Sequence, residues 1–213
     1  MKKIITVAPM QPVSPEGECY TAVNNHRLQY NEPACYPVLA LINGYIKPGE
    51  AVEVYILTTE GHEQCGKNYR EMARLIQALC QKIGASCAVS GIPVPFDESP
   101  ATHLSTFQAL LNRVGDGDIL YADMTYGSKC QAITLMMGLN YAYQSCDNCT
   151  VECFVYGSKD FRAGAGMGKR IFDVTSLFLM DQIVNELAKS GNRNPKKAIE
   201  AILAINSSFE EEG

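Results

Sequence analysis

The chain has 213 residues, and 46% of them are hydrophobic, which is enough to bury the core of one large domain or of one domain with a helical appendage. Its formal net charge of -5 and its sequence pI of about 5.3 exclude a broad basic surface for duplex DNA or RNA. No apolar run has membrane-spanning length, and the first residues lack the pattern of a secretory signal. We therefore expect a cytoplasmic protein without a membrane partner.

In chain order, short apolar runs alternate with apolar residues at helical spacing. The runs predict strands over residues 4–7, 52–57, 85–89, 119–122, 151–156 and 171–174. The helical spacing predicts helices over residues 33–46, 68–83, 104–114, 132–143, 177–187 and 195–205. The segment 20–30 is ambiguous.

This alternation indicates an α/β fold that is Rossmann-like, with a mainly parallel sheet flanked by helices on both faces and a C-terminal helical extension. We expect a ligand-binding domain over residues 1–190. Residues 191–213 are expected to form a final helix followed by an acidic tail or linker.

The loop after the first strand, residues 8–17, is rich in proline and glycine. It is too long for a plain connector, and its prolines stiffen the backbone. Both a binding loop at the sheet edge and a variable surface loop fit this composition. Under the first interpretation, the candidate ligand-binding residues are Pro9, Met10 and Gln11.

A second polar turn follows the second predicted strand, at what should be the same edge of the sheet. Its residues Thr58, Thr59 and Glu60 are candidates for ligand contact. Two such loops converging at one edge is the arrangement that a ligand crevice needs.

A third polar turn lies between the fourth predicted strand and the helix that follows it. It would place the hydroxyls of Thr125 and Ser128, the ammonium of Lys129 and free helix N–H groups at the carboxyl edge of the sheet. That edge favours anions. An ordinary structural role fits the same residues, with Ser128 as a helix cap, Gly127 as a turn residue and Lys129 as a solvated charge.

Asp123 stands at the end of the strand before this turn. Its carboxylate would repel a phosphate directly. We expect it to accept hydrogen bonds from N–H groups of the loop, to orient Thr125 or Lys129, or to hold a ribose hydroxyl.

Three of the nine cysteines, Cys146, Cys149 and Cys153, have spacings that zinc ligands can have. No second pair of cysteines or histidines follows at the distance found in zinc ribbons or fingers, so a turn into a strand is the favoured interpretation. We expect reduced cysteines, no metal and no cofactor.

The glycine-rich segment 164–169 is similar to a nucleotide-binding loop only in composition. Such a loop needs Gly at 163 and Ser or Thr at 170, where Ala163 and Arg170 stand. A mobile loop is favoured, with Arg162, Lys169 and Arg170 as candidates for contact with a ligand's phosphates.

Taken in order, these segments resemble the CRISPR-associated Rossmann fold (CARF) family. Its hallmark is a strand ending in Asp-x-Thr-x-Gly, followed by a basic residue near the helix start, and residues 123–129 match it. The likeness spans roughly residues 3–190 and includes residues 54–59, 92–95, 155–157 and 171–175. Two departures are the proline-containing first loop, in place of a glycine-rich turn, and Tyr126, in place of Gly or His.

The resemblance implies a receptor for cyclic oligoadenylate, either tetra- or hexa-adenylate, in type III CRISPR antiviral signalling. It implies a two-fold homodimer, which matches a ring that has two-fold symmetry itself. Lys129 would then pair with a phosphate, Thr125 and Ser128 would donate hydrogen bonds, and Tyr126 would stack on adenine.

Within the family, two functions stay open. Many members carry a HEPN ribonuclease, whose active site has an arginine followed a few residues later by a histidine, and no histidine here follows an arginine in that way. The chain would be the sensor domain of a longer effector or a stand-alone ring nuclease. A ring nuclease cleaves without metal, through attack of a ribose 2′-hydroxyl. In that case Lys129 would stabilise the developing charge, and Gln11 or Ser14 would orient the hydroxyl.

Outside the family, the main alternative is a Rossmann-like enzyme that uses NAD or S-adenosylmethionine. It predicts a glycine-rich turn after the first strand and an acidic residue at the end of the second. The proline-rich first loop argues against it, whereas Glu60 keeps it open. A zinc or redox protein built on Cys146, Cys149 and Cys153 is the third class.

Overall fold

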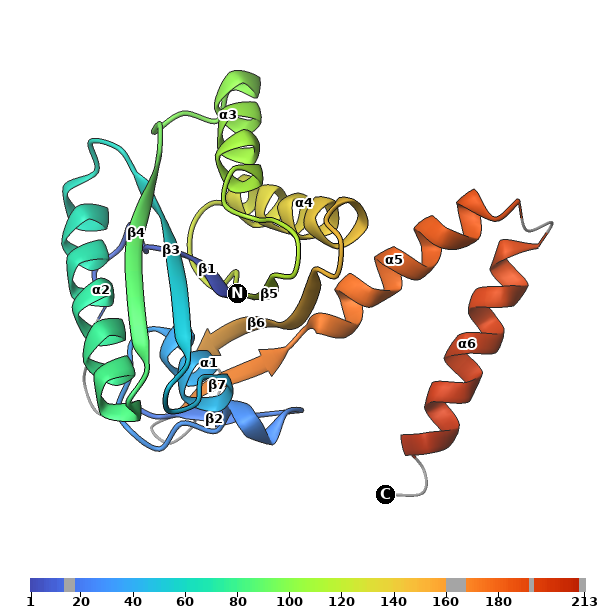
Figure 1. Cartoon of the computed structure of the whole chain (residues 1–213), viewed down its shortest axis with the longest axis horizontal. Coiled ribbons are helices and arrows are strands. Elements are labelled where there is room, and N and C mark those ends of the chain that lie inside the picture. The colour runs from blue at the N-terminus through green and yellow to red at the C-terminus, as the bar shows by residue number, and fades with distance from the viewer. Residues whose placement is uncertain (14–17, 160–167, 192–193, 211–213) are drawn as a thin grey trace. The chain divides into compact units, whose positions relative to one another are not determined.

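The computed structural model describes residues 1–13, 18–159, 168–191 and 194–210, with side chains to residue 202. The described residues form a seven-stranded sheet in the order β2-β7-β6-β5-β1-β3-β4 (Figure 1). Every pair of neighbouring strands is parallel except β6 and β7. The strands are β1 (Lys2–Val7), β2 (Tyr20–Ala22), β3 (Ala51–Thr59), β4 (Ser86–Val94), β5 (Ile119–Asp123), β6 (Thr150–Lys159) and β7 (Lys169–Asp173).

Helices cover both faces of this sheet. In Figure 1, α1 and α2 lie on one face, and α3 and α4 pack together on the other. The helices are α1 (Pro37–Tyr45), α2 (Glu63–Ile83), α3 (Pro100–Leu111), α4 (Lys129–Ser145), α5 (Thr175–Lys189) and α6 (Pro195–Glu210), with a short 3-10 helix at His26–Leu28. The predicted α/β, Rossmann-like class is confirmed.

The chain divides into two compact units, Met1–Thr175 and Ser176–Gly213. The first unit contains the whole sheet, and the second contains nearly all of α5 together with α6. The division falls after Thr175, the first residue of α5, whereas the sequence analysis placed the domain boundary after residue 190. No helix among the described residues is both long and apolar enough to cross a membrane.

The central strands are buried on both sides, which explains their continuous apolar runs. Ile4, Val54 and Leu120 have no exposed surface. The strand predicted over residues 85–89 continues to Val94, because β4 pairs with β3 along its whole length. Pro93 is tolerated there since β4 lies at the edge of the sheet.

The order of the strands reverses beside β1. After β1 the chain first forms the short strand β2 at the far edge of the sheet, and then β3 and β4 on one side of β1. It returns to β5 on the other side of β1 and continues to β6. The connections after β1 and β5 therefore lead to opposite faces of the sheet. In open α/β sheets this divergence leaves a crevice at the carboxyl ends of the two strands, where ligands bind.

Candidate functional site

A cavity of about 620 Å³ opens at the carboxyl ends of β1, β5 and β6. This volume lies within the range of small-molecule binding sites, roughly 300 to 1,000 Å³. We call it the main cavity. It is lined by residues 9–13, Glu18, Tyr20, residues 125–127, residues 156–159 and Lys169.

Two of the three predicted loops meet in the main cavity. Pro9, Met10 and Gln11 from the β1 loop line it together with Thr125, Tyr126 and Gly127 from the β5 loop. Asn68 on α2 holds the first loop, because its Nδ2 atom donates to the carbonyl oxygens of Pro9 at 2.7 Å and Gln11 at 2.8 Å. The β1 loop is thus held against the sheet as far as Gln11, whose side chain belongs to the cavity wall.

The other predicted residues lie elsewhere. Thr58 and Glu60 line neither the main cavity nor a smaller neighbour of about 180 Å³, whereas Thr59 and Ser128 line the smaller one. Glu60 is exposed. Lys129 is exposed at the first position of α4 and lines neither cavity. Ser14 and Arg162 fall outside the described residues.

Asp123 is completely buried, so within this chain it contacts no ligand. Its Oδ1 atom accepts hydrogen bonds from the N–H of Thr125 at 3.0 Å and from the Thr125 hydroxyl at 2.5 Å. Its Oδ2 atom accepts from the Thr6 hydroxyl at 3.0 Å. Of the three roles considered for this carboxylate, the structure shows two: it accepts a hydrogen bond from a loop N–H, that of Thr125, and it orients the Thr125 side chain. Burial raises the pKa of Asp123, and the hydrogen bonds from Thr125 oppose that shift in part.

Thr125 differs from its predicted role. Its hydroxyl proton goes to Asp123, and its oxygen accepts a hydrogen bond from the Gly157 N–H at 2.7 Å. A hydroxyl has one proton to donate, so this one is not available to a phosphate. The hydroxyl instead ties the β5 loop to β6.

Tyr126 lies in the wall of the main cavity, and its ring makes a T-shaped contact with Tyr36 at 6.2 Å between ring centroids. Its hydroxyl donates to the carbonyl oxygen of Cys35 at 2.6 Å. Burial raises the pKa of the Tyr126 phenol above its usual range. A ring anchored at both ends is part of the scaffold, and it has little freedom to turn toward an adenine.

Gly127 is a turn residue and Ser128 is a helix cap, which are the ordinary structural roles considered for them in the sequence analysis. Gly127 has φ of +94°, and a Cβ atom there would lie 2.5 Å from Gln131 Oε1 and 2.7 Å from Val7 Cγ1. The Ser128 hydroxyl accepts from the Gln131 N–H at 3.1 Å, and the Gln131 side chain accepts from the Ser128 N–H at 2.9 Å. This reciprocal pair is a capping box for α4.

Several residues of the main cavity lie outside the three predicted loops. Lys169 is only 9% exposed, and its Nζ atom donates to the Ala34 carbonyl oxygen at 2.7 Å and lies 5.7 Å from the centre of the Tyr20 ring. Burial lowers the pKa of Lys169. Lys159 forms an ion pair with Glu18 at 3.1 Å. Of these two lysines, Lys169 was a candidate from the sequence, as one of three basic residues around the glycine-rich segment.

Tyr156 is the exposed aromatic residue of the main cavity wall. It is 41% exposed, and its ring stacks on Phe172 with 6.4 Å between centroids and 29° between planes. The next residue is Gly157, where a Cβ atom would lie 2.5 Å from Pro37 Cγ. Tyr156 and Gly157 belong to the segment 155–157 that carries part of the family resemblance, but the sequence alone assigned them no contact.

The cysteines at 146, 149 and 153 form a turn and the start of β6, as favoured from the sequence. Cys149 and Cys153 are buried, and burial raises the pKa of Cys149 to about 11 and that of Cys153 to about 12. Cys153 donates its thiol proton to Asp173 Oδ2 at 3.6 Å. Within the part of the chain that the structure describes, the side chains that converge as metal ligands are other ones, in the loop before α3, on α3 and on α4.

Neither a scan against models of protein families nor a search of curated proteins finds a match to this chain.

Proposed function

We propose that this protein is a receptor for cyclic oligoadenylate in type III CRISPR antiviral signalling, acting as a sensor domain or as a metal-independent ring nuclease. The observation that carries the proposal is the meeting of the 9–13 and 125–127 loops in one cavity at the point where the strand order reverses. That is the ligand-binding position of open α/β sheets. The family resemblance of the sequence supplies the identity of the ligand.

The charges of the main cavity suit a phosphodiester. Among its described lining residues two are basic, Lys159 and Lys169, and one is acidic, Glu18, in a chain whose overall charge is -5. A partly desolvated ammonium group interacts more strongly with an anion than a solvated one does. Lys169 therefore takes the leading phosphate-binding role within one subunit.

Tyr156, and not Tyr126 as expected from the sequence, is the candidate for stacking on an adenine. Tyr156 is exposed, lines the cavity and stacks its ring on Phe172, whereas the Tyr126 hydroxyl is hydrogen-bonded to the backbone. An exposed ring with a fixed partner is a suitable platform for a nucleobase.

A two-fold homodimer gives Lys129 a role that the single subunit does not. Ile133, Met137 and Tyr141 follow one another at four-residue spacing along α4 and are 61%, 50% and 40% exposed. Lys129 stands four residues before Ile133 and so shares its face of the helix. Pairing of this apolar stripe between two copies would bring both Lys129 side chains near the symmetry axis, beside a ring bound by both subunits.

The NAD or S-adenosylmethionine alternative receives no comparable support. It needs the acidic residue after β3 to reach the bound ribose. Glu60 is exposed and lies outside both cavities.

Mass spectrometry of cyclic tetra- and hexa-adenylate, mixed with the protein in EDTA, tests the proposal. Recovery of linear fragments supports a ring nuclease, with Gln11 as the residue in the cavity wall that would orient the attacking 2′-hydroxyl. Intact rings that co-elute with the protein support a sensor. Intact rings that neither co-elute nor give a calorimetric signal contradict the proposal.

A further inference from the structure

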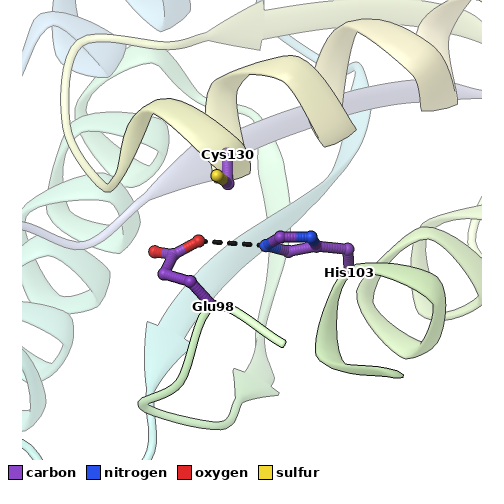
Figure 2. Close-up of side chains that lie close together, drawn as sticks. All are labelled: Glu98, His103 and Cys130. Atoms are coloured by element: carbon purple, nitrogen blue, oxygen red, sulfur yellow. Dashed lines mark hydrogen bonds and ion pairs between the residues drawn. The ribbon is translucent and has the colours of Figure 1, made fainter. Parts of the chain in front are cut away.

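A second group of reactive side chains lies on the face of the sheet that α3 and α4 cover, beside the smaller cavity. One ligand atom each from Glu98, His103 and Cys130 lies within 4.8 Å of the other two (Figure 2). Nε2 of His103 is 3.0 Å from Oε2 of Glu98. Figure 2 shows the Cys130 sulfur above the gap between the carboxylate and the imidazole.

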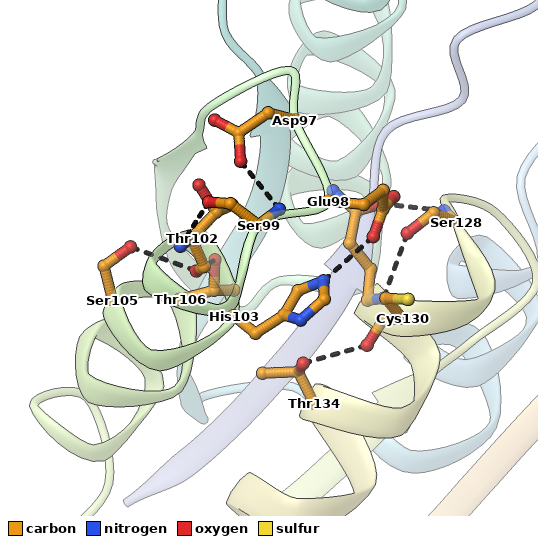
Figure 3. Close-up of polar contacts among 11 residues, drawn as sticks. Asp97, Glu98, Ser99, Thr102, His103, Ser105, Thr106, Ser128, Cys130 and Thr134 are labelled. Carbon is orange, nitrogen blue, oxygen red and sulfur yellow. Dashed lines mark hydrogen bonds and ion pairs between the residues drawn. The ribbon is translucent and has the colours of Figure 1, made fainter.

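The backbone around these three residues is held by its own hydrogen bonds (Figure 3). Glu98 precedes Ser99, whose hydroxyl caps α3 by accepting from the Thr102 N–H at 3.2 Å. Cys130 is the second residue of α4, and its carbonyl oxygen accepts from the Thr134 hydroxyl at 2.8 Å. These hydrogen bonds and the packing of α3 against α4 fix the backbone positions of the three residues, and none of the three residues is buried.

We propose that Glu98, His103 and Cys130 form a zinc site with an open coordination position. Thiolate, imidazole and carboxylate are the ligands that Zn²⁺ takes in proteins, with bonds of about 2.0 to 2.3 Å, which put ligand atoms roughly 3.3 to 3.8 Å apart. Rotation of the side chains would bring the three ligand atoms, now within 4.8 Å of one another, to these separations. A thiolate ligand selects zinc over magnesium or calcium, which prefer oxygen.

Three protein ligands leave one tetrahedral position for water or an added ligand, as in catalytic rather than structural zinc sites. Glu98 and His103 also line the cavity of about 180 Å³, together with Thr102, Ser128 and Gln131. The open position thus has a polar space beside it, next to the N-terminus of α4.

A cysteine nucleophile activated by histidine is the other chemistry that these residues suggest. In such a pair the imidazole accepts the thiol proton, and a third group orients the imidazole through its other nitrogen. Here the carboxylate of Glu98 faces the His103 Nε2 atom on the side where the thiol also lies. Three potential ligand atoms so close to one another, with the carboxylate on the thiol side of the imidazole, fit a shared cation better than a proton relay.

The test uses the full chain, freed of metal, with Zn²⁺ alone in calorimetry and Co²⁺ alone in absorption spectroscopy. We expect one Zn²⁺ per chain and a thiolate-to-cobalt charge-transfer band, with the strong visible bands of four-coordinate Co²⁺. Cys130→Ser should abolish the charge-transfer band, and both Cys130→Ser and His103→Gln should weaken zinc binding at least tenfold.

Cys146→Ser and His26→Gln are the matched controls, since they remove a half-buried thiol and an exposed imidazole elsewhere on the chain. Both should bind zinc as the unaltered protein does. No stoichiometric binding to the unaltered protein would overturn the proposal, as would binding unchanged in Cys130→Ser and His103→Gln, or lost in Cys146→Ser. The test contains no nucleotide, so its result is independent of the receptor proposal.

Discussion

The hydroxyl of Thr125 is bound to the buried carboxylate of Asp123, at 2.5 Å, and not directed at the cavity as a donor. The same arrangement occurs a second time. Thr175 donates its N–H at 2.9 Å and its hydroxyl to Asp173, and its oxygen accepts from the Phe154 N–H, as the Thr125 oxygen accepts from Gly157. An Asp-x-Thr sequence in this chain is therefore a clamp that ties the end of one strand to its neighbour.

Removing the Thr125 hydroxyl should destabilise the fold. Thr125→Val leaves the Gly157 N–H without its acceptor and Asp123 without one of its donors, so we expect the free energy of unfolding to fall by about 1 to 3 kcal/mol. Thr125→Ser keeps the hydroxyl and should recover most of that loss. Urea denaturation measures both, with Thr21→Val on the exposed side of β2 as control. Equal stability of Thr125→Val and the unaltered protein would contradict the clamp.

Stability should depend on pH through Asp123. Burial, the largest cause, raises its pKa in the folded state, so the folded chain holds this proton at pH values where the unfolded chain has lost it. The resulting stabilisation is complete below the ordinary pKa of aspartate, about 4, and is lost as the pH rises through the folded pKa.

Asp123→Asn removes this titration, so its unfolding free energy should fall less steeply with rising pH above about pH 4 than that of the unaltered protein. Urea midpoints measured across that range give the two slopes. Glu60→Gln changes an exposed carboxylate and should keep the original slope. The same slope in Asp123→Asn would show that another group is responsible.

Gly127 should tolerate no side chain. Gly127→Ala combines a positive φ with a Cβ atom 2.5 Å from Gln131 Oε1 and 2.7 Å from Val7 Cγ1. Gly61 is a matched control, because its φ is +69° and nothing lies within 4 Å of the added Cβ. We expect Gly61→Ala to cost about 1 kcal/mol and Gly127→Ala to cost about 1 to 3 kcal/mol more. Similar thermal stability of the two variants would show that the turn yields without strain.

Apart from β2 and the 3-10 helix, which lie in the ambiguous segment 20–30, the strands and helices could be predicted because their signals are local. The buried run ending at Ala122 and the helical period from Met72 to Ile83 each identify their element without any tertiary contact. The continuation of β4 to Val94 could not be predicted, since it depends on pairing with β3 along an edge where Pro93 does no harm.

Two of the three polar loops predicted to form the site line the main cavity, but the residues that complete its wall could not be placed from the sequence. The polar turns after β1 and β5 follow from the rule that ligands bind at the carboxyl edge of a parallel sheet. Lys169 and Tyr156 come from β7 and β6, and only strand order places them beside residues 125–127. Likewise, only the packing of α3 on α4 brings Cys130 to His103.

Tyr156 should contribute to binding of an adenine-containing ligand. Stacking of a base on an aromatic ring is worth about 1 to 3 kcal/mol, so Tyr156→Ala should weaken binding of cyclic oligoadenylate about tenfold or more. Tyr143→Ala removes an aromatic ring that is also 41% exposed but lies outside both cavities. Calorimetric titration of both variants separates a base platform from a general loss of aromatic surface. Equal affinities would contradict the assignment.

The apolar stripe of α4 and Lys129 should separate assembly from ligand binding. Met137→Glu places a charge in the middle of the stripe, so we expect a dimer to dissociate into monomers and ligand affinity to fall with it.

Lys129→Ala leaves the stripe intact and should weaken binding of cyclic oligoadenylate about tenfold or more through loss of a charge-assisted contact, with the dimer and the folded stability unchanged. Analytical ultracentrifugation and calorimetry on both variants measure the two effects. The exposed Lys47, on the turn after α1, provides a control for the loss of one positive charge as Lys47→Ala. A monomeric unaltered protein that binds the ring tightly, or a Lys129→Ala variant with full affinity, would show that a single subunit forms the complete site.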